Sequence, residues 1–224
     1  MIKTVFIDID DTLLDFDLSA EEAMFAAARD MGIPLPENML SIFVPINIGL
    51  WKDMEKGLIT PERLFEIRWN TIFSHIGVTA DGVAFEKIFT DYLSISAIPM
   101  EGAMEMMEYL SGKYTVCVAS NAPYRQQILR MEKVGMDRYI SHYFISERLG
   151  ASKPTKEFFD ACFAQLDGIR PDEAVIIGDS LTADINGGRQ YGMKTLWFCR
   201  KGDIRAEHGA DFAVEKLADV KKLL

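Results

Sequence analysis

The chain has 224 residues, of which 49% are hydrophobic and 26% are charged, a composition typical of a folded globular protein rather than a disordered or fibrous one. Its formal net charge of -10 argues against a nucleic-acid polymer or an anionic membrane as partner, because polyphosphates are bound by clustered lysines and arginines. No apolar run approaches the roughly 18 residues of a membrane span. The first residues lead into a strand-like segment rather than a signal peptide, so we expect a cytoplasmic protein.

The first predicted element is a strand at residues 2–7, whose near-continuous apolarity indicates burial on both faces. From about residue 16 to residue 96 the pattern changes to amphipathic stretches with no convincing strand. Helices are predicted there at residues 21–31, 61–74 and 83–92. The second is opened by Thr60 as N-cap and by Pro61 at the first helical position.

From about residue 100 onward, short apolar runs alternate with helical patterns, which is typical of a parallel sheet built from βαβ units. Strands are predicted at residues 115–119, 142–146, 174–178 and 194–198. Helices are predicted at residues 102–110, 124–134, 155–166 and 183–191. The predicted fold is therefore α/β, with a Rossmann-like parallel sheet in residues 1–15 and 97–224. Residues 16–96 are predicted to form an inserted helical domain.

Three carboxylates follow the first strand within four residues, namely Asp8, Asp10 and Asp11. Aspartates are common where a strand gives way to a turn, because their side chains cap backbone N–H groups. Three neighbouring negative charges also repel one another, which favours a bound cation. Carboxylate oxygens suit Mg²⁺, which keeps several waters and shares its shell with substrate phosphate. Taken alone, the segment fits a turn almost as well as a metal site.

A second acidic turn follows the strand predicted at residues 174–178 and contains Asp179 and Asp184. Ligands of open α/β sheets bind outside the carboxyl ends of the strands, where Asp8 and Asp179 would meet at one cation. As isolated residues, Asp179 or Ser180 are equally well explained as a helix N-cap. The pairing with Asp8 is what favours a metal site.

Polar residues also follow the strand predicted at residues 115–119. Ser120 and Asn121 precede a predicted helix, whose free N–H groups, together with the serine hydroxyl, can hold a phosphate oxygen. A plain N-cap explains Ser120 equally well. Lys153 lies in a polar loop before Pro154, where a lysine is usually a solvated surface charge.

The combination is more informative than its members. Four side chains follow in chain order, and three of them end predicted strands of one sheet: Asp8, Ser120, Lys153 and Asp179. This order resembles the four motifs of the haloacid dehalogenase superfamily, with residues 8–12 as the first motif and residues 178–184 as the fourth. The resemblance covers almost the whole chain. The helical insertion resembles the cap domain of the subgroup whose cap lies between the first two motifs.

The resemblance implies a phosphohydrolase in which Asp8 attacks phosphorus and forms an aspartyl-phosphate. Asp10 would protonate the leaving oxygen and then activate the water that cleaves this intermediate. Mg²⁺ would be held by the side chains of Asp8 and Asp179 and by the backbone carbonyl of Asp10, with Asp184 supporting the site.

The same resemblance implies that Ser120, Asn121 and Lys153 bind the substrate, the lysine also restraining Asp8. The partner would be a small phosphorylated metabolite rather than a nucleic-acid polymer or a membrane. We expect a monomer or a small homo-oligomer.

Asp10 separates chemistries within the superfamily, because true haloacid dehalogenases lack an acid two residues after the nucleophile. A phosphatase is therefore favoured. A closer resemblance, to cytosolic 5'-nucleotidases acting on pyrimidine and non-standard nucleoside monophosphates, is carried by residues 10–13, 47–51, 57–60 and 145–147. Ala122 departs from the glycine that this subgroup often has. In the cap, Phe16 and Trp51 are predicted to contact the substrate, while most other aromatics should form its core.

Three alternatives stay open at this point. The chain could act on another small phosphometabolite, such as a sugar phosphate or phosphoglycolate. It could be a catalytically idle relative that binds a phosphorylated ligand or a partner protein, although a binding module has no need of Asp10 beside Asp8. It could also be a phosphomutase.

Overall fold

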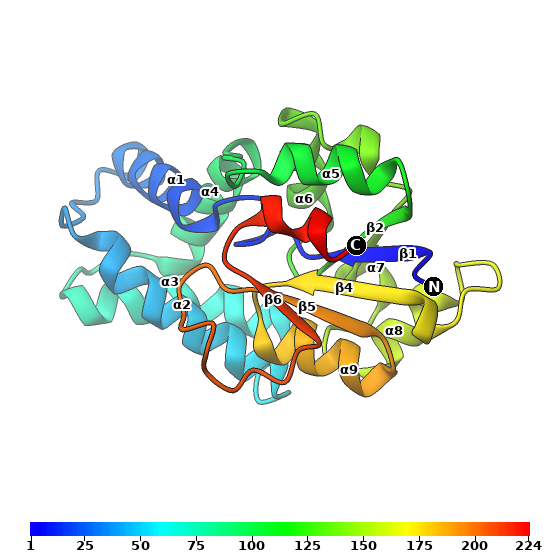
Figure 1. The fold of residues 1–224 in the computed structure, drawn as a ribbon. Helices are drawn as coiled ribbons and strands as arrows, with labels where there is room; N and C mark the ends of the chain where they lie inside the picture. Colours follow the sequence, from blue (N-terminus) through cyan, green and yellow to red (C-terminus); the bar gives the residue numbers. More distant parts are fainter. The chain divides into compact units, whose positions relative to one another are not determined.

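The computed structural model describes all residues from 1 to 224 (Figure 1). Residues 1–15 and 98–224 form one compact unit, and residues 16–97 form the other. We refer to them as the α/β unit and the helical unit. None of the helices combines the length and the apolarity that crossing a bilayer requires.

The α/β unit is built on a six-stranded parallel sheet with the strand order β3-β2-β1-β4-β5-β6 (Figure 1). The strands are β1 (Thr4–Ile7), β2 (Thr115–Ser120), β3 (His142–Ile145), β4 (Ala174–Gly178), β5 (Lys194–Phe198) and β6 (Phe212–Val214). Every residue of the central strand β1 is buried, as its apolar sequence predicts. The predicted Rossmann-like α/β fold is confirmed. The chain leaves β1 towards β2 on one side and later returns to β4 on the other, which makes β1 the switch point where α/β sheets bind ligands.

Helices cover both faces of this sheet (Figure 1). They are α5 (Ala103–Ser111), α6 (Tyr124–Lys133), α7 (Ser146–Leu149), α8 (Lys156–Phe163) and α9 (Gly187–Tyr191). On one face, side chains of α8 pack on β1, β2 and β4 in a core that includes Phe6, Phe158 and Ile176. The segment before α9, Leu181–Asn186, is a π-helical turn, a geometry found frequently at functional sites.

The helical unit contains α1 (Phe16–Met31), α2 (Met39–Glu55), α3 (Pro61–Ile76) and α4 (Gly82–Ile95). As predicted, Thr60 caps α3, its Oγ1 accepting a hydrogen bond from the Arg63 N–H at 3.2 Å. The core of this unit is rich in aromatic rings, which contact one another around Trp69.

Three elements were absent from the sequence prediction, and a fourth was predicted to begin too late. Helix α7 has only four residues, too few to show a helical repeat, and its first residue lay in the strand predicted at residues 142–146. Helix α2 contains Pro45 in its interior, and proline there removes a backbone hydrogen bond, so the helical signal was broken. Strand β6 has only three residues at the edge of the sheet, too few for an alternating pattern. Helix α1 starts at Phe16 rather than at the predicted residue 21.

Candidate active site

The strand register brings the first acidic residue to the centre of the site. Ile7 of β1 lies opposite Val118 of β2 and Ile177 of β4, so the chain leaves the sheet at Asp8 between two paired strands. The Asp8 N–H still donates to the Ile177 carbonyl at 2.9 Å, which fixes the backbone from which the carboxyl projects. Asp179 follows directly after β4. The two acids therefore meet because their strands are neighbours.

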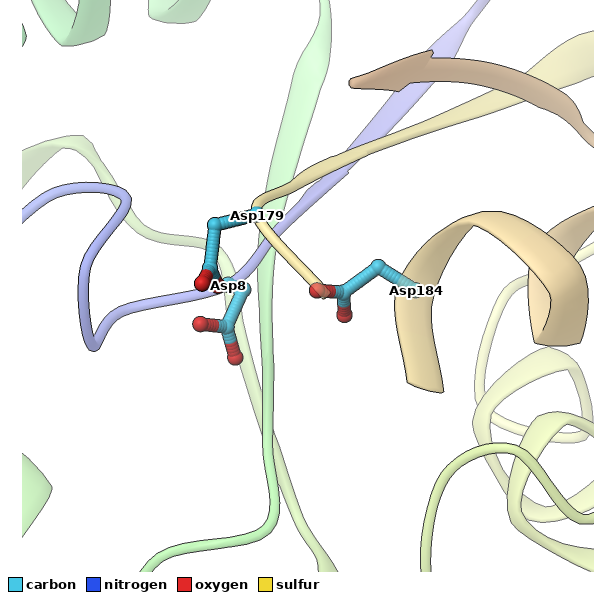
Figure 2. Close-up of side chains that lie close together, drawn as sticks. All are labelled: Asp8, Asp179 and Asp184. Atoms are coloured by element: carbon cyan, nitrogen blue, oxygen red, sulfur yellow. The ribbon is translucent and has the colours of Figure 1, made fainter. Parts of the chain in front are cut away.

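Asp184 completes a cluster of three carboxyl groups with Asp8 and Asp179 (Figure 2). One carboxylate oxygen from each residue lies within 4.8 Å of the others. Asp184 comes from the π-helical turn, and its Oδ2 accepts a hydrogen bond from the Ser180 N–H at 3.1 Å. A Cβ atom at Gly178 would lie only 2.2 Å from Asp184 Oδ2, so the glycine is required for this close approach.

Lys153 is the buried cation of the site, with only 2% of the residue exposed. Its Nζ donates to Asp8 Oδ1 at 2.7 Å, to Asp184 Oδ1 at 2.6 Å and to the Ala119 carbonyl at 2.6 Å. An ammonium has three N–H donors, and all three are directed at protein oxygens. Lys153 thus joins two of the three carboxylates and restrains Asp8, and a phosphate oxygen would have to share or replace one of these bonds.

The three carboxyl groups of this cluster carry more negative charge, when ionised, than the single ammonium group of Lys153 can neutralise. Burial raises the pKa of Asp8 to about 8, with Asp184 and Asp10 acting in the same direction and Lys153 opposing them. Burial and the carboxylates of Asp8 and Asp184 also raise the pKa of Asp179 well above its ordinary value. Burial alone would lower the pKa of Lys153, but Asp184 and Asp8 together raise it. One ammonium faces three carboxylates, so a divalent cation bound by oxygen ligands fits this donor set.

Ser120 and Asn121 end β2 and have different surroundings. Ser120 is 2% exposed, and its Oγ accepts hydrogen bonds from the Ala122 N–H at 3.2 Å and from Gln127 Nε2 at 3.0 Å. Asn121 holds the loop of Lys153 instead: Nδ2 donates to the Lys153 carbonyl and Oδ1 accepts from the Lys153 N–H, both at 2.9 Å. The Asn121 side chain therefore holds the backbone of Lys153, and its contact with substrate stays a prediction.

Asp10 lies outside the three-carboxylate cluster and is bound by helix α6. Its Oδ1 accepts from Arg130 Nη1 at 2.5 Å and its Oδ2 accepts from Gln127 Nε2 at 2.7 Å. Neither Gln127 nor Arg130 was found from the sequence, although both lie within a correctly predicted helix. The sequence signal that could have identified them is their spacing, because residues three positions apart lie on the same face of a helix.

A further contact that sequence reasoning missed comes from β5. The Trp197 Nε1–H donates to the backbone carbonyl of Asp179 at 2.9 Å, with the tryptophan 7% exposed. A buried indole N–H usually finds such a partner. The contact fixes the peptide that carries the Asp179 carboxyl.

The two predicted substrate contacts of the helical unit are both involved in packing there. Phe16 is 9% exposed and stacks on Phe43 with 6.3 Å between ring centroids. Trp51 is half-buried and meets the ring of Phe65 edge-on at 6.2 Å. Phe16 is thus mostly committed to the core of the helical unit, whereas Trp51 retains an exposed surface.

Asp179→Asn is expected to raise the melting temperature in EDTA by a few degrees and to remove any stabilisation by added Mg²⁺, which we expect for the wild type. Because the pKa of Asp179 is raised in the folded state, its carboxyl stabilises the fold only while protonated, and that contribution is lost as the pH rises through the raised pKa. The difference between variant and wild type should therefore grow with pH and vanish in acid.

Thermal melts from pH 4 to pH 9, with and without Mg²⁺, measure this effect. Asp172→Asn is the control, because a surface ion pair with Arg170 lowers the pKa of Asp172 and its loss should not raise the melting temperature. If Asp179→Asn melted at a lower temperature than the wild type in EDTA at high pH, this would show that the ionised carboxyl of Asp179 does not destabilise the fold.

Comparison with known proteins agrees with this geometry. A family model described as haloacid dehalogenase-like hydrolase matches residues 2–192. YfnB of Bacillus subtilis (strain 168), named as a HAD-hydrolase, is 31% identical over 195 residues, covering 87% of this chain and 83% of YfnB. The pyrimidine 5'-nucleotidase PynA of Streptococcus pneumoniae (strain ATCC BAA-255 / R6) is 32% identical over 197 residues, covering 88% of this chain and 83% of PynA.

The structural likeness spans both units. A crystal structure of YfnB bound to magnesium matches with a TM-score of 0.92 and 29% identity, covering 100% of this chain and 98% of that one. The glyceraldehyde 3-phosphate phosphatase of Pyrococcus furiosus (strain ATCC 43587 / DSM 3638 / JCM 8422 / Vc1) is 28% identical over 243 residues, covering 100% of this chain and 93% of the relative. The family model and the relatives above 30% identity each cover most of the sequence, and the chain therefore belongs to the haloacid dehalogenase-like hydrolase family.

Proposed function

We propose that this chain is a magnesium-dependent phosphomonoesterase in which Asp8 is the nucleophile and Asp10 is the general acid and base. The observation that carries the proposal is the pair of differently placed carboxyls. Asp8 lies in the three-carboxylate cluster against Lys153, whereas Asp10 is held apart from it by Arg130 and Gln127. Two carboxyls in different environments are suited to two different roles.

The hydrogen bond of Lys153 to Asp8 distinguishes the two oxygens of the Asp8 carboxyl. Lys153 holds Asp8 Oδ1, which leaves Oδ2 to attack phosphorus and form an aspartyl-phosphate. Asp10 donates a proton to the departing oxygen and then accepts one from the water that cleaves the intermediate. Mg²⁺, held by Asp8 and Asp179 with Asp184 in support, would offset charge on the transferring group. The crystal structure of the related YfnB, described as bound to magnesium, supports the choice of cation.

For the substrate, we propose a nucleoside 5'-monophosphate. The support is the nucleotidase-like sequence segments together with 32% identity to PynA, which is a pyrimidine 5'-nucleotidase. A second candidate is a small sugar or triose phosphate, since the Pyrococcus furiosus relative that is 28% identical is a glyceraldehyde 3-phosphate phosphatase. The helical unit, acting as a cap, would choose between them, with the half-buried Trp51 as a candidate contact.

Phosphate release from a panel of esters is expected to separate these candidates. The panel contains pyrimidine and purine nucleoside monophosphates, sugar phosphates, glyceraldehyde 3-phosphate and phosphoglycolate, each tested with Mg²⁺ and with EDTA. We expect release with Mg²⁺ only, and the highest kcat/KM for a nucleoside monophosphate.

The other outcomes are equally informative. Release confined to sugar or triose phosphates would retain the mechanism and contradict the nucleotidase proposal. Binding of a phosphorylated ligand without release would indicate a catalytically idle relative. Transfer of the phosphoryl group to a second hydroxyl of the same molecule, without free phosphate, would indicate a mutase.

A further inference from the structure

Helix α6 presents two buried polar side chains to Asp10, from positions more than a hundred residues along the chain. Arg130 and Gln127 are both 0% exposed. Arg130 Nη1 donates to Asp10 Oδ1 at 2.5 Å and Gln127 Nε2 donates to Asp10 Oδ2 at 2.7 Å, so each carboxylate oxygen has its own donor. Arg130 Nη1 also donates to Gln127 Oε1 at 3.1 Å, which joins the two donors into one network.

The network also reaches the end of β2. Gln127 Nε2 donates to Ser120 Oγ at 3.0 Å as well as to Asp10. A single buried amide therefore sets the separation between the Asp10 carboxyl and the Ser120 hydroxyl. The Asp10 side chain keeps 24% of its surface exposed, and each carboxylate oxygen retains a lone pair beyond the one that α6 occupies.

Stability alone is a weak explanation for this arrangement. A buried ion pair costs desolvation energy that its attraction often does no more than repay, and well-packed apolar residues can replace such a pair without loss. Here the pair orients a carboxyl that is 24% exposed and reaches solvent, instead of filling a core. Orientation of a group that transfers protons is a function that apolar residues cannot supply.

We propose that Gln127 and Arg130 are positioning residues that hold the Asp10 carboxyl beside Ser120, and that they determine how well the enzyme expels leaving groups that need a proton. This inference rests on the proposed phosphomonoesterase function. When the P–O bond to an alcohol breaks, the departing alkoxide takes the proton of Asp10. In the second step water attacks phosphorus, gives a proton to Asp10, and the bond between phosphorus and Asp8 breaks to release phosphate.

The proposal predicts a dependence on the leaving group. An alkyl phosphate needs the proton, whereas p-nitrophenolate leaves readily without one. Since kcat/KM covers the steps up to formation of the aspartyl-phosphate, removing a positioning residue should lower it more for the alkyl ester than for the nitrophenyl ester. A residue with a purely structural role would lower both to the same extent.

The test compares kcat/KM for p-nitrophenyl phosphate with that for the alkyl phosphate that the wild type hydrolyses best in the panel above. The variants are Gln127→Met, Arg130→Met, Arg130→Lys and Asp10→Asn, with thermal melts to verify folding. Gln126→Met is the matched control, because Gln126 is also buried on α6 but has no hydrogen bond to Asp10.

For Gln127→Met and Arg130→Met we expect the loss on the alkyl ester to be about 10- to 100-fold larger than the loss on the nitrophenyl ester, since any change at Ser120 affects both esters alike. Arg130→Lys should recover part of the alkyl activity, because the ammonium retains a charged donor. In the Asp10→Asn background, Gln127→Met should not change the ratio of kcat/KM between the two esters, because the carboxyl to be positioned is already lost.

Equal losses on both esters in Gln127→Met and Arg130→Met, with an active wild type, would overturn the inference and leave the proposed function intact. The same skew in Gln126→Met would also overturn it. A wild type that hydrolyses neither ester would instead contradict the proposed function. If Arg130→Met does not fold, Gln127→Met decides the question alone.

Discussion

Asp8→Asn is expected to lower kcat by at least about 10⁴-fold, because an amide cannot act as the nucleophile that takes the phosphoryl group. The fold should survive the change. The side chains have the same shape, and burial already raises the pKa of Asp8 to about 8, so a neutral group at this position is no burden. Phosphate release with Mg²⁺ and thermal melts in EDTA measure the two effects separately.

Asp11→Asn is the matched control for this variant. Asp11 lies three residues along the same turn but pairs with Arg200, and its φ of 57° is a conformation that asparagine adopts readily. We expect its kcat to fall by less than about 10-fold, on the order of one lost, partly buried hydrogen bond. An Asp8→Asn protein that is folded and as active as the wild type would remove Asp8 from the mechanism.

Lys153→Met is expected to affect both stability and turnover. The residue is 2% exposed and pairs with Asp8 and Asp184, so its removal leaves two buried carboxyl groups without their charged donor. Breaking a buried pair in this way costs about 3–5 kcal/mol, which for a chain of this size lowers the melting temperature on the order of 10 °C. Loss of a charged donor to the nucleophile should also reduce kcat by about 10²- to 10³-fold.

Lys156→Met supplies the comparison for this prediction. Lys156 pairs with Asp160 at the surface with 73% of its side chain exposed, and such pairs contribute about 0–1 kcal/mol. Denaturant unfolding without metal and kinetics with Mg²⁺ should therefore show a large change for Lys153→Met and almost none for Lys156→Met. Similar stabilities for the two variants would contradict the role assigned to Lys153.

The sheet was predictable because its strands are buried on both faces and read as continuous apolar runs. Residues 174–178 and 194–198 were predicted as strands and match the bounds of β4 and β5. The acidic turns after β1 and β4 were also visible, since charged residues directly after an apolar run are conspicuous. Helix α2 was not predicted, because Pro45 interrupts its helical pattern. Packing within the core of the helical unit nevertheless maintains this helix.

The parts of the site that the sequence did not reveal are contacts across the fold. Gln127, Arg130 and Trp197 act on Asp10 and Asp179 from other elements, and their partners depend on strand order and helix packing. For the same reason the hydrogen bonds of Asn121 to the Lys153 backbone could not be read from spacing. Single-sequence patterns identify residues with unusual chemistry at strand ends, whereas their supporting contacts require the tertiary structure.

Direct detection of a phosphoryl group on Asp8 tests the central claim. The Asp10→Asn variant should still be phosphorylated by p-nitrophenyl phosphate, because the leaving group needs no proton, but should hydrolyse the intermediate slowly for lack of a base. Rapid quenching followed by borohydride reduction would convert an aspartyl-phosphate to homoserine, which mass spectrometry locates in the sequence. We expect a burst of about one nitrophenolate per enzyme and homoserine at position 8. Continued release of nitrophenolate with no burst and with unmodified Asp8 would contradict it.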